Sequence, residues 1–190
     1  MSLDDDQVLI QKILAGKRAS FEELMKKHNK RIFGYIYRMV RDEDVAIELT
    51  QDFFLKLYHV LDKYNFEYKF TTWAYRICYN MVIDHVRKNP AHIESLENDT
   101  IIPKLMDSEN YVKEDTLDDL VKEEIREYTW SVVNRIPPKF RELILMRYLQ
   151  ELKYEEIADI TQLPVGTVKN RLFKAKEMLK TELEKDGVLK

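Results

Sequence analysis

The chain contains little of what interrupts helices or cross-links loops. Its 190 residues include one cysteine, four glycines and five prolines. The single cysteine, Cys78, excludes an internal disulfide framework and a cysteine-rich zinc site, and it suits a reducing compartment. Because glycine and proline are the strongest breakers of regular structure, their scarcity favours a helical fold.

Long apolar runs and a basic leader are also missing. No stretch of about twenty apolar residues occurs, so we expect no membrane span. The N-terminal segment MSLDDDQVLIQKILAG is acidic where a signal peptide would be basic, and its apolar residues are spaced as on an amphipathic helix. These features predict a cytoplasmic protein.

The net charge of −3 conceals an uneven distribution along the chain. Residues 1–90 carry 15 basic against 13 acidic side chains, and residues 128–190 carry 12 against 9. Residues 91–127, in contrast, carry 4 basic against 12 acidic ones. Two weakly basic ends therefore flank a strongly acidic middle, and the ends are compatible with nucleic-acid binding.

The apolar periodicity predicts helices on both sides of the acidic stretch. The predicted helices span residues 3–15, 20–40, 42–62, 71–88, 117–135, 138–149, 153–160 and 164–185. Ser20 is placed as the N-cap of the second helix. We therefore predict an all-α protein with helical domains at 1–90 and 119–190, joined by an acidic linker at 91–118.

The segment YEEIADITQLPVGTVKNRLFKAKEMLK predicts a helix-turn-helix unit. The apolar stripe of its second helix comprises Val168, Leu172, Ala175 and Leu179, and the opposite side carries Thr167, Lys169, Asn170, Arg171 and Lys174. Near the start of that helix, Gly166 removes a side chain where the backbone would meet a phosphate. The pattern is that of a recognition helix in the major groove, and the alternative is a solvated basic face.

A second informative segment is DKYNFEYKFTTWAYRICYNMVIDHVRK. Arg76, Asn80 and Arg87 share one stripe of its predicted helix, and Trp73 lies at the edge of that stripe beside an aromatic loop. Cations beside aromatic rings suit single-stranded DNA, because cations follow the backbone while rings stack on bases. Core aromatics with a few surface cations remain the alternative.

With these segments in place, the chain resembles a sigma factor of the extracytoplasmic-function (ECF) group of the sigma-70 family. DVAIELTQDFFLKLY is similar to the family's polymerase-binding helix, FTTWAYRICYNMVIDHVRK to its promoter-melting helix, and YEEIADITQLPVGTVKNRLFKAKEML to its upstream-element reader. The resemblance implies a sigma2 domain at the N-terminal end and a sigma4 domain at the C-terminal end. It further implies three partners: core RNA polymerase, contacted through its β′ clamp helices and β flap, promoter DNA, and an anti-sigma factor.

The resemblance also assigns residues to these partners. Asp44, Glu48, Gln51 and Asp52 fall where relatives meet the polymerase clamp. Positions that meet the −10 element are Asn65, Phe66, Glu67, Tyr68 and Lys69 in the loop that captures a flipped base, with Trp73, Arg76 and Asn80 on the adjoining helix. Positions that meet the −35 element are Arg147, Pro164, Gly166, Thr167, Lys169, Asn170, Phe173 and Lys174.

We expect no catalytic centre, cofactor or metal site. The four histidines, His28, His59, His85 and His92, show no metal-ligand spacing with one another or with Cys78, and no phosphate-binding glycine loop or nucleophile motif occurs. The acidic linker resembles a family segment that threads the polymerase channel later filled by RNA, and a solvated spacer is the alternative.

A sigma-like mimic and a simple helix-turn-helix repressor are the alternatives to the function of an alternative sigma factor. A sigma-like mimic would sequester an anti-sigma factor without contacting promoters, and it would not need DNA-facing residues such as Arg76, Asn80 and Lys174. A simple helix-turn-helix repressor would explain residues 138–180 but would leave the N-terminal helices without a role.

Overall fold

The computed structural model describes residues 4–89 and 128–188. Within these ranges the chain is helical and has no strand, which confirms the predicted all-α class. The elements are α1 (Asp5–Leu14), α2 (Ala19–Val40), α3 (Glu43–Val60), the 3-10 turn η1 (Leu61–Lys63), α4 (Phe70–Lys88), a helical stretch at 128–134, α7 (Pro138–Ile144), the π-helical turn η2 (Leu145–Leu149), α8 (Tyr154–Thr161) and α9 (Val165–Lys185). The predicted linker at 91–118 and the first part of the predicted helix 117–135 lie outside the described residues.

Local chemistry explains where the first helices begin and end. Asp4 and Gln7 form a reciprocal capping box at the start of α1. The helix ends at Leu14, and the turn that follows contains Gly16, whose φ of 88° is accessible to glycine without strain. The prediction of Ser20 as an N-cap is wrong. Helix α2 begins at Ala19 without a side-chain cap, and Ser20 is buried within its first turn.

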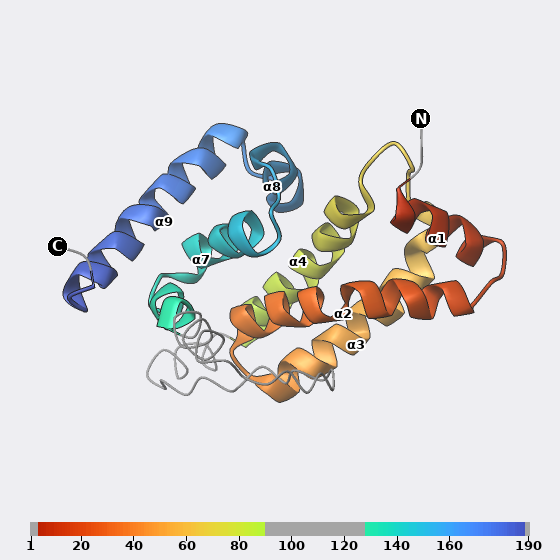
Figure 1. Cartoon of the computed structure of the whole chain (residues 1–190), viewed down its shortest axis with the longest axis horizontal. Coiled ribbons are helices and arrows are strands. Elements are labelled where there is room, and N and C mark those ends of the chain that lie inside the picture. Colours follow the sequence, from red (N-terminus) through yellow and green to blue (C-terminus); the bar gives the residue numbers. More distant parts are fainter. Residues whose placement is uncertain (1–3, 90–127, 189–190) are drawn as a thin grey trace, which may run out of the picture.

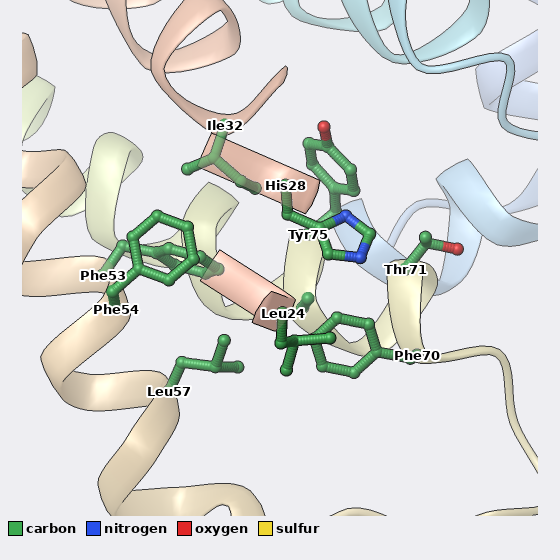
Figure 2. A pocket seen from close by; sticks show the side chains of 10 residues that line it. Leu24, His28, Ile32, Phe53, Phe54, Leu57, Phe70, Thr71 and Tyr75 are labelled. Atoms are coloured by element: carbon green, nitrogen blue, oxygen red, sulfur yellow. The ribbon is translucent and has the colours of Figure 1, made fainter. Parts of the chain in front are cut away.

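Helices α1 to α4 pack into an N-terminal bundle. Leu24 from α2, Phe53 and Leu57 from α3, and Phe70 from α4 meet at its centre, as Figure 2 shows. The cavity among these side chains has a volume of ≈ 10 Å³. This volume is about that of one water probe, so the bundle has a packed core and no ligand pocket at this point.

In the C-terminal half, a buried arginine connects two helices. Arg141 on α7 is 1% exposed, and its Nη2 donates hydrogen bonds to the carbonyl oxygens of Asn134 (2.9 Å) and Ile136 (3.2 Å). Asn134 is the last residue of the 128–134 helix, where carbonyls lack helical donors, and Ile136 lies in the turn that follows. The buried guanidinium therefore joins that helix to α7.

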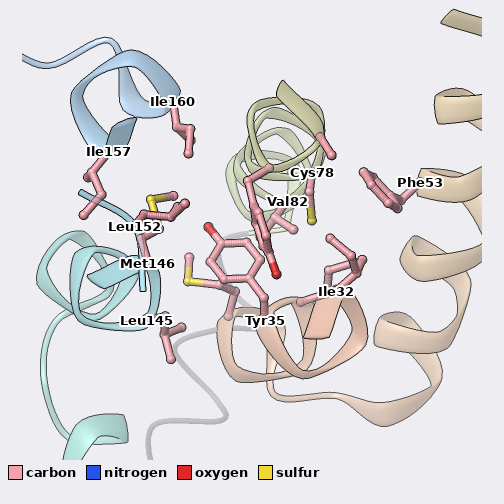
Figure 3. Packing of buried hydrophobic residues seen from close by; sticks show 14 of the residues in the cluster. Ile32, Tyr35, Phe53, Cys78, Val82, Leu145, Met146, Leu152, Ile157 and Ile160 are labelled. Carbon is pink, nitrogen blue, oxygen red and sulfur yellow. The ribbon is translucent and has the colours of Figure 1, made fainter. Parts of the chain in front are cut away.

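The two groups of helices lie against each other. Figure 1 shows α7 and α8 between α9 on one side and α4 on the other. In Figure 3, Tyr35 from α2 and Val82 from α4 face Met146 and Leu152 from the C-terminal half, and all four are buried. One apolar cluster therefore continues from the N-terminal bundle into the C-terminal helices.

Candidate nucleic-acid and polymerase interfaces

The outward face of α9 carries most of the side chains assigned to the −35 element. Val168, Leu172 and Ala175 of the predicted apolar stripe are buried and Leu179 is half-buried, so the opposite side of α9 faces outward. Lys169, Asn170 and Lys174 are exposed there, and the ring of Phe173 is 64% exposed. The face thus combines cations suited to phosphates with an amide and an apolar ring suited to base edges.

The start of α9 borders a polar hollow of about 400 Å³. Lys139 from α7 and Gly166, Arg171 and Lys174 from α9 are among the residues that line it. The N-cap residue, Pro164, makes no side-chain hydrogen bond to the first amides of the helix. Because a Cβ on Gly166 would meet nothing within 4 Å, this helix start is open on its outer side. Positive side chains and first-turn amides here suit an anion such as a DNA phosphate.

Tyr154 brings together two cations from different elements. Arg147 from η2 lies over the Tyr154 ring with its Cζ 5.2 Å from the centroid, and its Nη1 donates a hydrogen bond to the carbonyl of Leu152 (2.9 Å). The Nζ of Lys169 on α9 lies 5.8 Å from the same centroid. These contacts orient both cations at one edge of the helix-turn-helix unit.

The loop before α4, residues 64–69, is built on a group of aromatic rings. The Tyr64 ring is buried and lies 5.0 Å from Phe66 and 5.3 Å from Trp73, measured between centroids. Phe66 and Trp73 are themselves half-buried, whereas Tyr68 is 63% exposed. The structure therefore brings the predicted loop and the predicted Trp73 together around Tyr64, a residue that the sequence interpretation did not assign.

Farther along α4, Arg76 and Asn80, which were assigned to the −10 element, face outward. Arg76 and Asn80 are one helical turn apart and exposed, while Cys78 and Val82 on the other side are buried. Burial raises the pKa of the Cys78 thiol well above its usual range, which leaves Cys78 as a neutral core residue.

The outward face of α3 is acidic and apolar at once. All four residues assigned to the polymerase clamp are exposed on this helix: Asp44, Glu48, Gln51 and Asp52. Ile47 and Leu55 stand among them, 42% and 61% exposed. Exposed apolar side chains beside carboxylates are typical of a protein-binding surface. Ile47 and Leu55 were not assigned to this surface from the sequence.

Polar contacts hold α8 and η2 against α4. The Tyr75 hydroxyl donates a hydrogen bond to Oε1 of Gln150. Glu156 Oε1 lies 3.1 Å from the Nζ of Lys69 and accepts a hydrogen bond from Thr72 Oγ1 (3.3 Å). Burial opposes the ionisation of Glu156, but the Lys153 amide, Lys69 and Thr72 together hold its pKa below the usual value. Lys69, which we assigned to −10 DNA, is thus paired with a carboxylate of the C-terminal half.

Two known families match separate parts of the chain. The family described as Sigma-70 region 2 matches residues 24–91, and the family described as Sigma-70, region 4 matches residues 126–179. The first match includes α3, the aromatic loop and α4, and the second includes α7, α8 and most of α9. The surfaces described above therefore lie within these two regions.

Characterised relatives resemble almost the entire chain. The ECF RNA polymerase sigma-E factor of Escherichia coli (strain K12) is 30% identical over 181 residues, which cover 94% of this chain and 94% of the relative. The chain belongs to the ECF group of the sigma-70 family. ECF RNA polymerase sigma factor SigW of Bacillus subtilis (strain 168) is 28% identical to this sigma factor over 180 residues, covering 92% of the chain and 94% of the relative.

Solved structures share the fold of this sigma factor. CnrH in complex with the cytosolic domain of CnrY superposes with a TM-score of 0.69 at 21% identity, covering 96% of this chain and 99% of that chain. The sigma factor RpoE of Bartonella quintana, in complex with the anti-sigma factor NepR, gives a TM-score of 0.63 at 20% identity, covering 86% and 96% of the two chains.

Metal-binding groups and membrane-spanning helices are both absent from the part of the sigma factor that the structure describes. Residues 4–89 and 128–188 contain no group of three or more His, Cys, Asp or Glu side chains placed to hold a metal ion. None of the helices described in these ranges is both long and apolar enough to cross a bilayer.

Proposed function

We propose that this sigma factor binds core RNA polymerase through α3, contacts the duplex −35 element with α9, and opens the −10 element with the 64–69 loop and α4. The observation that carries the proposal is the presence of both sigma-70 regions on one chain, each with an exposed polar face. A sigma-like mimic would need neither the outward Arg76 and Asn80 nor the cationic face of α9.

In this proposal the domains and residues keep the roles that the resemblance gave them. Residues 1–90 form sigma2, residues 119–190 form sigma4, and 91–118 link them. Asp44, Glu48, Gln51 and Asp52 contact the β′ clamp helices, with Ile47 and Leu55 adding apolar area to that contact. Sigma4 contacts the β flap.

The free energy for opening DNA would come from binding. Extruding a base costs a few kcal/mol, which a fitted pocket beside Phe66 and Trp73 can offset without a chemical step. The protein would therefore act as a specificity subunit and not as an enzyme. It would work in the cytoplasm, where core polymerase and promoter DNA are found.

An anti-sigma factor is the third proposed partner. Two structural neighbours are complexes of this kind: CnrH is bound to the cytosolic domain of CnrY, and RpoE is bound to the anti-sigma factor NepR. The shared fold supports a similar partner for this chain, and the exposed apolar residues of α3 offer a surface for it.

Transcription in vitro with core polymerase tests the proposed opening role. Replacing Asn80 or Phe66 by Ala should leave polymerase binding intact and impair strand opening, because these side chains border the proposed path of the −10 strand. Transcription should recover on a template whose −10 region is already mismatched, since that template requires no melting. Asn29→Ala, the same change at an exposed position of α2, is the matched control.

Permanganate reactivity of promoter thymines measures the open strand directly. Wild-type reactivity in both the Asn80 and Phe66 variants would contradict the assignment of this surface to −10 DNA. Loss of polymerase binding in these variants would show that the two residues maintain the fold instead.

A further inference from the structure

The side chain of Gln7, on the first turn of α1, reaches into the loop proposed to receive the −10 base. Its Nε2 donates to the carbonyl oxygen of Phe66 (2.8 Å) and lies 3.2 Å from the Tyr64 hydroxyl and 3.4 Å from the carbonyl oxygen of Tyr68. Gln7 is 9% exposed, although it is polar and lies near the end of the chain. The donor end of the carboxamide is therefore enclosed by the loop.

The acceptor end of the same side chain has a separate task. Gln7 Oε1 accepts a hydrogen bond from the Asp4 amide (3.3 Å), and the Gln7 amide donates to the Asp4 carboxylate (2.8 Å). These two bonds form the capping box of α1. The loop contacts and the helix cap thus use different atoms, so one substitution can remove the first while keeping an acceptor for the second.

Tyr64 extends the contact across the loop. Its hydroxyl lies beside the Gln7 donor and itself donates a hydrogen bond to the carbonyl oxygen of Tyr68 (2.5 Å). The carbonyls of Phe66 and Tyr68 are consequently held toward α1, which fixes the 66–67 and 68–69 peptide planes around Glu67. That residue is exposed between them, and its amide donates to Oδ1 of Asn65 (2.9 Å).

Carboxamide chemistry suits this position. A glutamine offers two N–H donors without bringing a charge, and the loop presents two carbonyl oxygens and a hydroxyl. A lysine or arginine would bury a charge there, and a carboxylate would face acceptors. An exposed glutamine on the same helix, Gln11, has no such loop contacts among the described hydrogen bonds.

We propose that Gln7 is a positioning residue for promoter opening, which holds the 64–69 loop in the conformation that receives an extruded −10 base. This inference rests on the proposed function, because it needs the loop to bind DNA. A loop held in its binding conformation before DNA arrives loses less conformational entropy on binding. Gln7 would therefore affect base capture without touching the base.

Gln7→Glu is the informative variant. It preserves the size of the side chain and an acceptor for the Asp4 amide, and it replaces the donor nitrogen with an oxygen that faces the loop carbonyls. Gln11→Glu is the matched control, because it makes the same change at an exposed position of α1. Asp4→Ala is a second control, since it breaks the capping box and retains the Gln7 donors.

Abasic substitutions provide a measurement that a loss of stability alone would not change. Reconstituted holoenzyme is bound to promoters pre-opened by mismatches, in which each −10 nucleotide of the non-template strand is made abasic in turn. We expect the wild type to lose about tenfold in affinity when the captured nucleotide is abasic. Gln7→Glu should bind intact DNA about tenfold more weakly than the wild type, and an abasic site at the captured position should weaken its binding little further. Both controls should keep the wild-type penalty at that position.

The possible outcomes separate the inference from the function on which it rests. If Gln7→Glu weakens binding to all templates equally and keeps the full abasic penalty, Gln7 does not position the loop. If wild-type holoenzyme shows no penalty at any −10 nucleotide, the proposed role of the loop is itself wrong. Should thermal unfolding show that Gln7→Glu does not fold, Gln7→Met removes the donors without adding a charge and keeps a side chain of similar length. A full abasic penalty in Gln7→Met would then overturn the inference.

Discussion

Glu142 on α7 is a carboxyl group buried near the junction of the two halves. It is 5% exposed, and burial raises its pKa from 4.5 to about 7, although Arg171 on α9 opposes the shift. Burial raises the pKa of Tyr35 on α2 and of Tyr79 on α4, and a negative Glu142 raises both further. The neutral form of Glu142 therefore suits this packing better than the ionised form does.

The protonation of Glu142 should make stability depend on pH. Between pH 4.5 and pH 7 the folded protein binds a proton that the unfolded chain has released, so this contribution is complete below that window and is lost as pH rises through it. The full loss is on the order of 3 kcal/mol of unfolding free energy. Glu142→Gln should lack this loss, so denaturant unfolding should show the variant gaining stability relative to wild type from pH 5 to pH 8.

Glu155→Gln is the control for this measurement, because Glu155 is an exposed glutamate on α8. Its unfolding curve should follow that of the wild type across the pH range. Parallel pH profiles for wild type and Glu142→Gln would show that Glu142 does not titrate differently in the folded protein.

At the scale of elements, the outward side of α9 allows DNA contacts to be tested separately from the fold. Replacing Lys174 or Lys169 by Ala should weaken contacts with the −35 element and spare polymerase binding, because both side chains point away from the buried stripe. The loss of one phosphate contact should reduce the slope of log affinity against log salt by about one unit. Footprinting of the −35 element by holoenzyme at several salt concentrations measures both effects.

Lys180→Ala is the matched control on α9. Lys180 is an exposed cation of the same helix, but it lies beyond the residues assigned to DNA and within 3.8 Å of Glu184. An unchanged −35 footprint in both the Lys169 and Lys174 variants would mean that α9 does not read DNA with this face.

Most helices were predictable from the sequence because each has a buried stripe. The predicted recognition helix 164–185 is observed as Val165–Lys185, with Val168, Leu172 and Ala175 of the expected stripe buried and Leu179 half-buried. The N-cap at Ser20 was not predictable in the same way. Several residues near a helix start can accept a hydrogen bond, and which one caps the helix depends on the turn that precedes it.

For the whole molecule, the size of the compact chain is smaller than the distance between the two promoter elements. A compact chain of this length has a radius of gyration of roughly 16 Å. The −10 and −35 elements are about 25 base pairs apart by their names, which is about 85 Å of B-form DNA at about 3.4 Å per base pair. If α4 and α9 contact the two elements as proposed, α8 must therefore separate from α4 in the promoter complex.

Distance measurements between two spin labels should therefore detect a separation of the halves. Cys78 is the single cysteine and is fully buried, so labels can be attached selectively at Lys26→Cys on α2 and Lys180→Cys on α9, two exposed positions. We expect a label distance below about 50 Å in the free protein, the size of a compact chain. In the open promoter complex the distance should increase by tens of ångströms, on the order of the spacing of the two elements.

The free protein should also bind duplex promoter DNA weakly, because each end of the chain has only a small excess of positive charge. Tight, salt-insensitive binding by the free chain would instead support a repressor.

For the spin-label experiment, an unchanged label distance in the promoter complex would show that one of the two proposed DNA surfaces is not used.

The all-α class, the helix-turn-helix unit with the outward Lys169 and Lys174, and the family resemblance follow from the order of the residues. These features depend on local periodicity and on motifs of adjacent residues. Three contacts, in contrast, became known from the folded chain: Gln7 contacts the loop 57 residues or more away, Glu156 pairs with Lys69, and Glu142 is buried. They depend on how helices pack in space, because side chains distant in sequence leave no periodic pattern when they meet.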